Sequence, residues 1–423
     1  MKFLVKAKAR GFWFGCVVLG LFLASGPELV LGQLAADEPK TRAEEIELAR
    51  RDRVTRLWPE RESPMVQQAN KLLERGFKEG AGSGKGANGP QILMGGMRSG
   101  QGTAFGLGYR RSDLFRDHLG FRVTGRGTFQ KAYMFDLEVN SPALQSDHFR
   151  FGFYTKYENS PQMDFYGLGP DTKEEDRTSY RFEDFFADLR MSFDLFRSFR
   201  INAHGGILNV NTGQGQRSKY PSIEEVFPPE STPGLAQQTN FWQLGGSLQF
   251  DYRDFPGDPR GGGNYLVGVT QYWDRKLDEH TFRNLDLIAE QYIPYFNRTH
   301  VLVLRAQTRM AWARDESTVP FYMAPVLGGN EFLRGFTWYR FRDVNSLILT
   351  AEHRWHVFSG GHAAIFVDAG KVAAERSDID FNDLEVIGGF GLRFQMESRV
   401  FMRIDVAGSR EGFRLIWTFN NVF

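Results

Sequence analysis

Two short segments decide the fold of this chain: Gly328-Gly329-Asn330-Glu331-Phe332-Leu333-Arg334-Gly335-Phe336 and Phe366-Val367-Asp368-Ala369-Gly370. Arg334 stands between bulky residues and a glycine in a long hydrophilic stretch, whereas Asp368 stands in an otherwise apolar one. A carboxylate in an apolar strand is costly unless it is paired, and an arginine can donate two hydrogen bonds to it at once. The sequence therefore predicts that Arg334 meets Asp368 in the folded chain.

Much of the chain after Gln91 alternates between apolar and polar residues. The clearest runs are 302–307, 390–397, 400–407 and 413–420, in which residues such as Arg393, Arg403 and Asp405 take the polar positions. A period of two residues indicates β-strands with one apolar face. A soluble β-sandwich would show the same pattern, so the alternation alone leaves a sandwich and a membrane barrel open.

The connections between the strands separate these alternatives. Strands are expected near 91–97, 102–111, 119–129, 132–140, 147–158, 178–195, 198–210, 239–252, 262–274, 281–292, 299–312, 344–353, 362–369, 385–396, 399–408 and 411–420. The long connections 159–177, 211–238, 313–343 and 370–384 each follow an odd-numbered strand, as in outer-membrane barrels with long outer loops and short periplasmic turns. The sequence predicts an all-β fold, a 16-stranded antiparallel transmembrane β-barrel over residues 91–423.

The first 90 residues differ from the rest of the chain in composition and lack its alternating pattern. A basic start, an apolar run from Gly11 to Ala24 and a plausible cleavage site at Val30-Leu31-Gly32 predict a signal peptide over 1–32, with a single membrane helix as the alternative. Residues 33–90 are expected to form a short helical and flexible periplasmic extension with a Gly-rich linker, or else a partner-binding element. The one cysteine, Cys16, falls in the signal peptide, so no thiol chemistry is expected of the mature chain.

Composition and motifs argue against several kinds of site. The formal net charge of +1 is unlike that of a nucleic-acid binder. His353 and His356 are three residues apart and would face opposite sides of a strand, which makes them a poor pair of metal ligands. Gly261-Gly262-Gly263 lacks the strand-to-helix context of a phosphate loop. We predict no catalytic, cofactor-binding or metal-binding residue and no enzyme, with an outer-membrane phospholipase kept as an alternative.

The Leu-Arg-Gly-Phe and Phe-x-Asp-x-Gly segments together resemble the signature of the BamA/TamA superfamily of outer-membrane barrels, the bacterial surface antigens. Three further stretches are similar to segments of that family: 165–171, 251–262 and Arg410-x-Gly412-x-x-Leu415-x-Trp417, with Phe423 at the end of the chain. The resemblance implies a lumen-loop motif of Leu333, Arg334, Gly335 and Phe336. It implies acidic partners on the inner barrel wall, here Glu352 and Asp368. It also implies a barrel-assembly signal of Gly412, Leu415, Trp417 and Phe423.

The resemblance also implies a location and an activity. The expected place is the outer membrane of a Gram-negative bacterium, and the expected work is insertion or translocation of proteins or lipids by bilayer disturbance and opening between the first and last strands. The implied partners are outer-membrane lipid, lipopolysaccharide and client outer-membrane proteins, with the barrel as a monomer and without nucleic acid. Residues 33–90 are too few for the POTRA modules of family members that assemble proteins, so a plain pore or structural surface barrel is the alternative.

Overall fold

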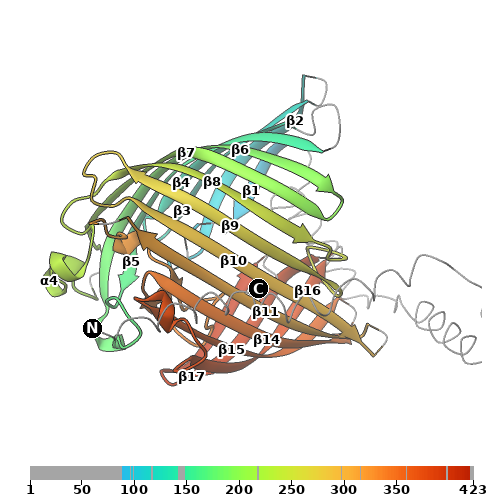
Figure 1. The fold of residues 1–423 in the computed structure, drawn as a ribbon. Coiled ribbons are helices and arrows are strands. Elements are labelled where there is room, and N and C mark those ends of the chain that lie inside the picture. Colours follow the sequence, from blue (N-terminus) through green and yellow to red (C-terminus); the bar gives the residue numbers. More distant parts are fainter. Residues whose placement is uncertain are drawn as a thin grey trace, which may run out of the picture.

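The computed structural model describes residues 88–419, except 96, 99, 116–117, 142–147, 217–218, 297, 315, 359 and 397–398. The predicted signal peptide, nearly all of the predicted extension and the terminal Phe423 lie outside the described residues. Most of what is described is one antiparallel sheet of sixteen strands that curls round into a barrel (Figure 1).

Each strand is hydrogen-bonded to its neighbours in chain order, except that β14 follows β11 in the sheet. The first eight strands are β1 (Gly89–Met94), β2 (Ala104–Leu114), β3 (Leu119–Thr128), β4 (Tyr133–Ser141), β5 (Phe149–Phe165), β6 (Thr178–Phe196), β7 (Phe199–Gln214) and β8 (Asn240–Asp251). The second eight are β9 (Gly262–Asp274), β10 (Phe282–Tyr295), β11 (His300–Ala313), β14 (Asn345–Phe358), β15 (Gly361–Ala373), β16 (Glu385–Met396), β17 (Arg399–Ser409) and β18 (Gly412–Phe419).

Short elements lie in the connections. A separate two-stranded ladder joins β12 (Val326–Leu327) to β13 (Phe341–Arg342). The helices are α4 (Ile223–Val226) and the single 3-10 turns η3 (Glu174–Asp176), η4 (Pro229–Ser231), η5 (Phe321–Met323) and η6 (Arg376–Asp378). No helix in the described ranges has the length and apolar character needed to cross a bilayer.

The prediction of a 16-stranded antiparallel barrel is confirmed, and each expected strand has an observed counterpart. Several boundaries were wrong, and two of them show why. The first strand ends at Met94 and not at Met97, because Gly95 has a φ of +78° and turns the chain out of the ladder. The fifth strand continues to Phe165, seven residues beyond its expected end at 158, because its later residues still pair with β6. The β12–β13 ladder was not predicted.

The alternation predicted from the sequence becomes the two faces of the barrel wall. On β8, Trp242, Leu244 and Leu248 point outward and are largely exposed, whereas Gln243 between them is buried in the interior. Lipid tails would cover such an outward apolar face, and the interior accepts the polar residues. This is why the mean hydropathy of the chain is only −0.40 although its outer face is apolar.

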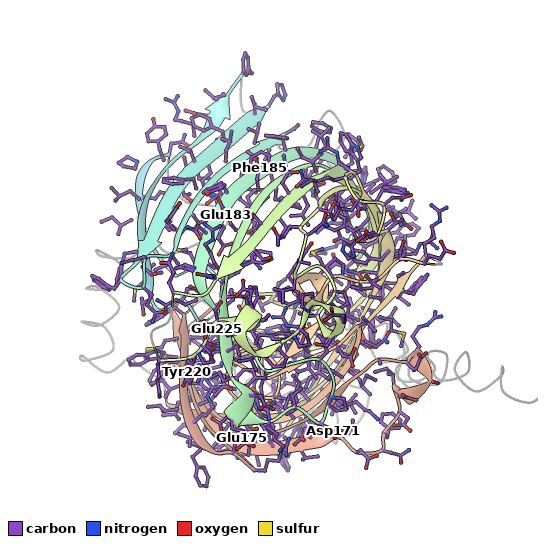
Figure 2. All side chains as sticks on the ribbon, turned by 90° about the vertical axis from the view of Figure 1, so that its left-hand side faces the viewer. Asp171, Glu175, Glu183, Phe185, Tyr220 and Glu225 are labelled. Carbon is purple, nitrogen blue, oxygen red and sulfur yellow. The ribbon has the colours of Figure 1, made fainter. Side chains whose placement is uncertain are left out.

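The long connections 166–177, 215–239, 314–344 and 374–384 emerge at one end of the barrel, here called the long-loop end. Inside that end, Phe321 and Tyr322 from 314–344 and Ile223 and Leu235 from 215–239 pack on inward side chains of the wall. In Figure 2, which views the molecule end-on, loop residues such as Glu225 lie over the area that the strands enclose. The lumen is therefore filled with an apolar core at this end.

The opposite, short-turn end is also partly covered. The connection 252–261 between β8 and β9 reaches strands that are not its neighbours in the sheet. Gly257 accepts a hydrogen bond from the backbone N–H of Val400 at 3.1 Å, and the Arg260 guanidinium lies 3.1 Å from Nε2 of His362 on β15. This turn belongs to the segment 251–262 that the sequence singled out, and it ties two sides of the barrel together.

The sheet has two free edges among the described strands. β1 is hydrogen-bonded to β2 alone, and β18 to β17 alone. β1 has six residues and β18 has eight, whereas β5 and β6 have 17 and 19. The seam between β1 and β18 is therefore flanked by some of the shortest strands of the wall.

Candidate functional site

The connection 314–344 turns back into the lumen through a loop that its glycines make possible. Gly328 and Gly329 have φ values of +104° and +118°, and an added Cβ at Gly329 would lie 2.2 Å from the Trp338 ring. Their backbone N–H groups donate to the carbonyls of Phe332 and Phe336 at 3.0 and 3.2 Å. The loop is thus a compact, internally bonded unit that presents residues 333–336 to the inner wall.

Leu333, Gly335 and Phe336 fix this loop against the wall. Leu333 and Phe336 are buried in an apolar cluster with inward residues of β14 to β18, such as Phe366 and Ile387. At Gly335 an added Cβ would lie 2.9 Å from Cβ of Ser409, so the glycine permits close approach to β17. Within this motif, Leu333 and not Gly335 has the positive φ, at 48°. Anchoring on both sides of Arg334 leaves its side chain little freedom.

Arg334 makes ion pairs with three acids of the inner wall. Its Nε and Nη2 donate to the two carboxylate oxygens of Asp368, each at 2.8 Å. Its Nη1 donates to Glu352 at 3.0 Å and lies 3.4 Å from a carboxylate oxygen of Asp405. The side chain of Arg334 is 2% exposed and those of the three acids are 0% exposed, so the group is withdrawn from water.

Three further arginines complete the cluster. Arg354 donates to Glu352 at 2.6 Å, Arg393 donates to Glu352 at 3.0 Å and pairs with Asp405, and Arg403 lies 3.1 Å from Asp405. Arg403 also donates to the carbonyl of Asn330 in the loop. The cluster holds four arginines and three acids and therefore carries one more positive charge than negative. We call these seven residues the lumen cluster: Arg334, Glu352, Arg354, Asp368, Arg393, Arg403 and Asp405.

Strand register brings the wall residues of the cluster together. Thr350 on β14 lies opposite Asp368 on β15 and donates to it at 3.0 Å, while Gly391 on β16 lies opposite Asp405 on β17. A Cβ at Gly391 would come within 1.9 Å of a carboxylate oxygen of Asp405, so only glycine leaves room for the ion pairs there. The Arg334 guanidinium also stacks 3.4 Å from the centre of the Phe366 ring, which adds a cation–π contact.

The electrostatics of the cluster hold the loop in one position. Burial on its own would lower the pKa of Arg334, but Asp368 first, then Glu352 and Asp405, raise it above the ordinary arginine value. The guanidinium therefore stays charged, and it is the arginine that pairs with Asp368, whereas Glu352 and Asp405 also pair with arginines of the wall. Such a cluster is a structural lock and shows none of the geometry of a nucleophile with its base. The described residues hold no group of three metal-ligating side chains.

The structure brings together the residues that the sequence proposed for this motif and adds others. Arg334, Glu352 and Asp368 meet as expected from the charges, whereas Arg354, Arg393, Arg403 and Asp405 were not proposed as members. Three of these lie on the polar positions of the alternating runs 390–397 and 400–407, which is the signal that could have found them. His353 and His356 do not pair: His353 lies 3.0 Å from His300, and His356 packs on His362.

The residues proposed as the assembly signal lie at the edge of the sheet. Gly412 opens β18 with a φ of +119°, and Leu415 and Trp417 point outward, each 70% exposed. Their apolar side chains thus extend the outer face to the free edge beside the seam. Phe423 lies outside the described residues.

Comparison with known proteins agrees with this geometry. The Omp85 superfamily domain matches residues 99–406. The structure is similar to BamA from Haemophilus ducreyi lacking POTRA domains 1–3, at a TM-score of 0.58 and 15% identity, over 84% of this chain and 78% of that one. It is also similar to CdiB from Escherichia coli, at a TM-score of 0.53 and 13% identity, over 77% of this chain and 60% of that one. A search of curated proteins finds no match.

The domain match spans well over half of the 423 residues and includes both the loop motif and Asp368. The predicted resemblance and the predicted place, the outer membrane of a Gram-negative bacterium, are thereby confirmed. The chain belongs to the Omp85 superfamily.

Proposed function

We propose that this barrel assists the insertion or translocation of proteins, or lipids, at the outer membrane by opening between β1 and β18. The seam carries the proposal: both flanking strands are short, and each is paired on one side only among the described strands. Unpaired backbone groups in a bilayer seek partners, because hydrocarbon offers none. A client strand can satisfy them by adding to the free edge, as in other cases of strand addition.

The lumen cluster has a supporting role in this proposal. It joins the loop 328–336 to β14, β15, β16 and β17, and so keeps the wall beside the seam rigid while the seam itself moves. The same proposal includes client outer-membrane proteins and bilayer lipid as partners, and a monomeric barrel. It also holds that the barrel acts without a catalytic centre.

The alternative, a plain pore, makes a different demand on the lumen. A conducting barrel needs a continuous aqueous channel, but here an apolar cluster including Phe165, Tyr180 and Phe321 fills the long-loop end. We therefore favour the seam. In a planar bilayer the purified barrel is expected to show low conductance, and a wide, stable conductance would support the pore.

The decisive experiment locks the seam in the native host. Cysteines placed at Ile92 and at successive positions of β18 are cross-linked across the seam, and the outer-membrane proteins are then counted. Met402→Cys with Phe419→Cys is the matched control, because these residues already lie opposite each other on β17 and β18. The seam lock should lower the amounts of client barrels, as depletion of the protein should, and the control lock should not. Unchanged client amounts under both treatments would rule out the proposed activity.

A further inference from the structure

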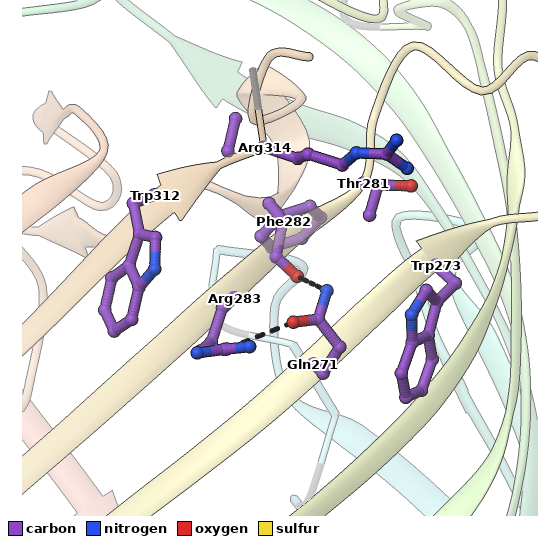
Figure 3. A pocket seen from close by; sticks show the side chains of 8 residues that line it. Gln271, Trp273, Thr281, Phe282, Arg283, Trp312 and Arg314 are labelled. Atoms are coloured by element: carbon purple, nitrogen blue, oxygen red, sulfur yellow. Dashed lines mark hydrogen bonds between the residues drawn. The ribbon is translucent and has the colours of Figure 1, made fainter. Parts of the chain in front are cut away.

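A second feature lies on the outer face of the barrel, away from the seam and the lumen cluster. At the long-loop end, β9, β10 and β11 enclose a cavity of about 310 Å³ (Figure 3). Trp273 of β9, Arg283 of β10 and Trp312 of β11 line it, and Gln271 and Arg314 complete the polar part. The proposed function assigns no role to this cavity.

Strand register shows that the cavity opens to the lipid side of the wall. Arg283 lies opposite Gln271 on one side and Trp312 on the other, so these three side chains share one face. The neighbouring pair Phe282 and Tyr272 packs into the lumen core, which makes the face of Arg283 the outer one. Since β9 and β11 end here at the long-loop end, the cavity is expected at the level of the outer-leaflet headgroups.

The cavity is basic, and among the residues that the structure describes its cations have no acidic partner. None of its lining residues is acidic, and neither Arg283 nor Arg314 forms an ion pair with any residue that the structure describes. Arg309, also on β11 but facing the lumen, has such a pair with Asp286. An arginine at headgroup level that has no acidic partner in the protein can pair with an anionic lipid headgroup.

The local geometry orients the arginine toward such an anion. Gln271 donates to the carbonyl of Phe282 at 2.9 Å and accepts from Nε of Arg283 at 3.1 Å, as Figure 3 shows. This bond occupies Nε and leaves the Nη groups of the guanidinium for another acceptor. Arg376 approaches the Trp312 ring at 5.3 Å from the connection 374–384, so a further cation lies at the rim.

We propose that this cavity binds the phosphorylated headgroup of an outer-leaflet glycolipid of the lipopolysaccharide type. The guanidinium groups of Arg283 and Arg314 would each donate to phosphate oxygens, an arrangement for which arginine is well suited. Trp273 and Trp312 would contact the sugar and the start of the acyl chains, as tryptophans do at membrane interfaces. An inner-leaflet phospholipid would meet the opposite ends of these strands, so position selects the glycolipid.

Native mass spectrometry of the full, folded chain in detergent tests this assignment. The probes are diphosphorylated lipid A, dephosphorylated lipid A and phosphatidylglycerol. Arg283→Gln together with Arg314→Gln should weaken retention of diphosphorylated lipid A roughly tenfold or more, since hydrogen bonds to charged groups are strong. The control is Arg111→Gln, which removes an outward arginine that already pairs with Asp113 at 2.8 Å on β2. A heat-modifiable gel band checks that every variant is folded.

The proposal requires three results together. The folded double variant must lose diphosphorylated lipid A while the Arg111 variant keeps it, and the unsubstituted chain must hold dephosphorylated lipid A much less. Equal retention by the double variant and the unsubstituted chain would overturn the site. Equal retention of the dephosphorylated lipid would overturn the role of phosphate. Equal retention of phosphatidylglycerol at the same residues would overturn the choice of an outer-leaflet glycolipid.

Discussion

At the scale of single residues, Arg334 is the one whose loss should cost most. Arg334→Ala would leave the buried Asp368 without its arginine partner and would remove one of the three arginines that pair with Glu352. Breaking a buried pair in this way costs about 3–5 kcal/mol. Arg410→Ala is the control, because its pair with Glu385 is exposed and worth roughly 0–1 kcal/mol. Urea unfolding, followed by heat-modifiability on gels, measures both. Equal midpoints for the two variants would remove the special role of Arg334.

Arg340, in the same loop, is a poor control for this comparison. It is buried, pairs with Glu411 at 2.8 Å and donates to the hydroxyl of Thr172 at 2.8 Å, so it joins three connections of the long-loop end. Arg340 is therefore a buried, structural residue and not an exposed loop arginine. Coupling is better measured by a cycle of Arg334→Ala and Asp368→Asn, whose effects should be far from additive because the two residues share two hydrogen bonds.

A glycine offers a test of the lumen cluster that changes no charge. Gly391→Ala would push a methyl group into the Asp405–Arg393 pair and should destabilise the barrel by about 1–3 kcal/mol, as overpacking commonly does. Gly388→Ala, on the same strand, is the matched control because the nearest atom to its added Cβ is 4.0 Å away. If both substitutions shift the urea midpoint equally, strand propensity and not the cluster explains the loss.

The sequence could predict part of this cluster. Arg334 and Asp368 stand out because each is the wrong kind of residue for its surroundings, a signal that needs no structure. Arg393, Arg403 and Asp405 were visible as polar positions of strands but not as partners. Their meeting depends on the register of β16 with β17 and on the point where the loop 328–336 lands. Neither the register nor the position of the loop can be read from the apolar–polar alternation within a single strand.

At the scale of elements, the sorting of connections predicts the orientation in the membrane. Glu375→Cys, in the exposed connection 374–384, should react with an impermeant thiol reagent on intact cells. Ser398→Cys, in the predicted periplasmic connection 397–398, should react only after the outer membrane is permeabilised. The one natural cysteine, Cys16, lies in the predicted signal peptide, so background labelling should be small. Labelling of Ser398→Cys on intact cells would invert the predicted orientation.

The strands could be predicted because the alternation of apolar and polar residues recurs over many positions. The ends of the strands were harder to predict. β7 continues to Gln214, four residues past the expected end at 210, because Asn211 to Gln214 still bond to β6. β12 and β13 have two residues each, too few for any alternation to be seen. The apolar core in the lumen at the long-loop end was not predicted either. Ile223 and Phe321 belong to it, but in the sequence they look like any other apolar residue of a long connection.

At the scale of the whole molecule, the barrel should not need the segment before it. The boundary expected at Gln91 lies inside β1, because Gly89 and Pro90 already pair with Arg110 and Tyr109. A chain that joins the signal peptide to Ala87 should therefore insert and stay heat-modifiable, whereas removal of residues 420–423 should impair assembly. Failure of the first with success of the second would make residues 33–87 part of the folding unit.

The lumen cluster also has a consequence for the order of events in folding. Arg334 precedes its three acidic partners along the chain by 18, 34 and 71 residues. Until β14, β15 and β17 have all joined the sheet, the Arg334 guanidinium in the lumen would be dehydrated without acidic partners to offset the cost. The loop must therefore enter late, after the C-terminal third of the wall exists. Protease cleavage within 314–344 would therefore identify barrels whose wall is still incomplete. The onset of resistance in this segment would give the time at which the wall is completed.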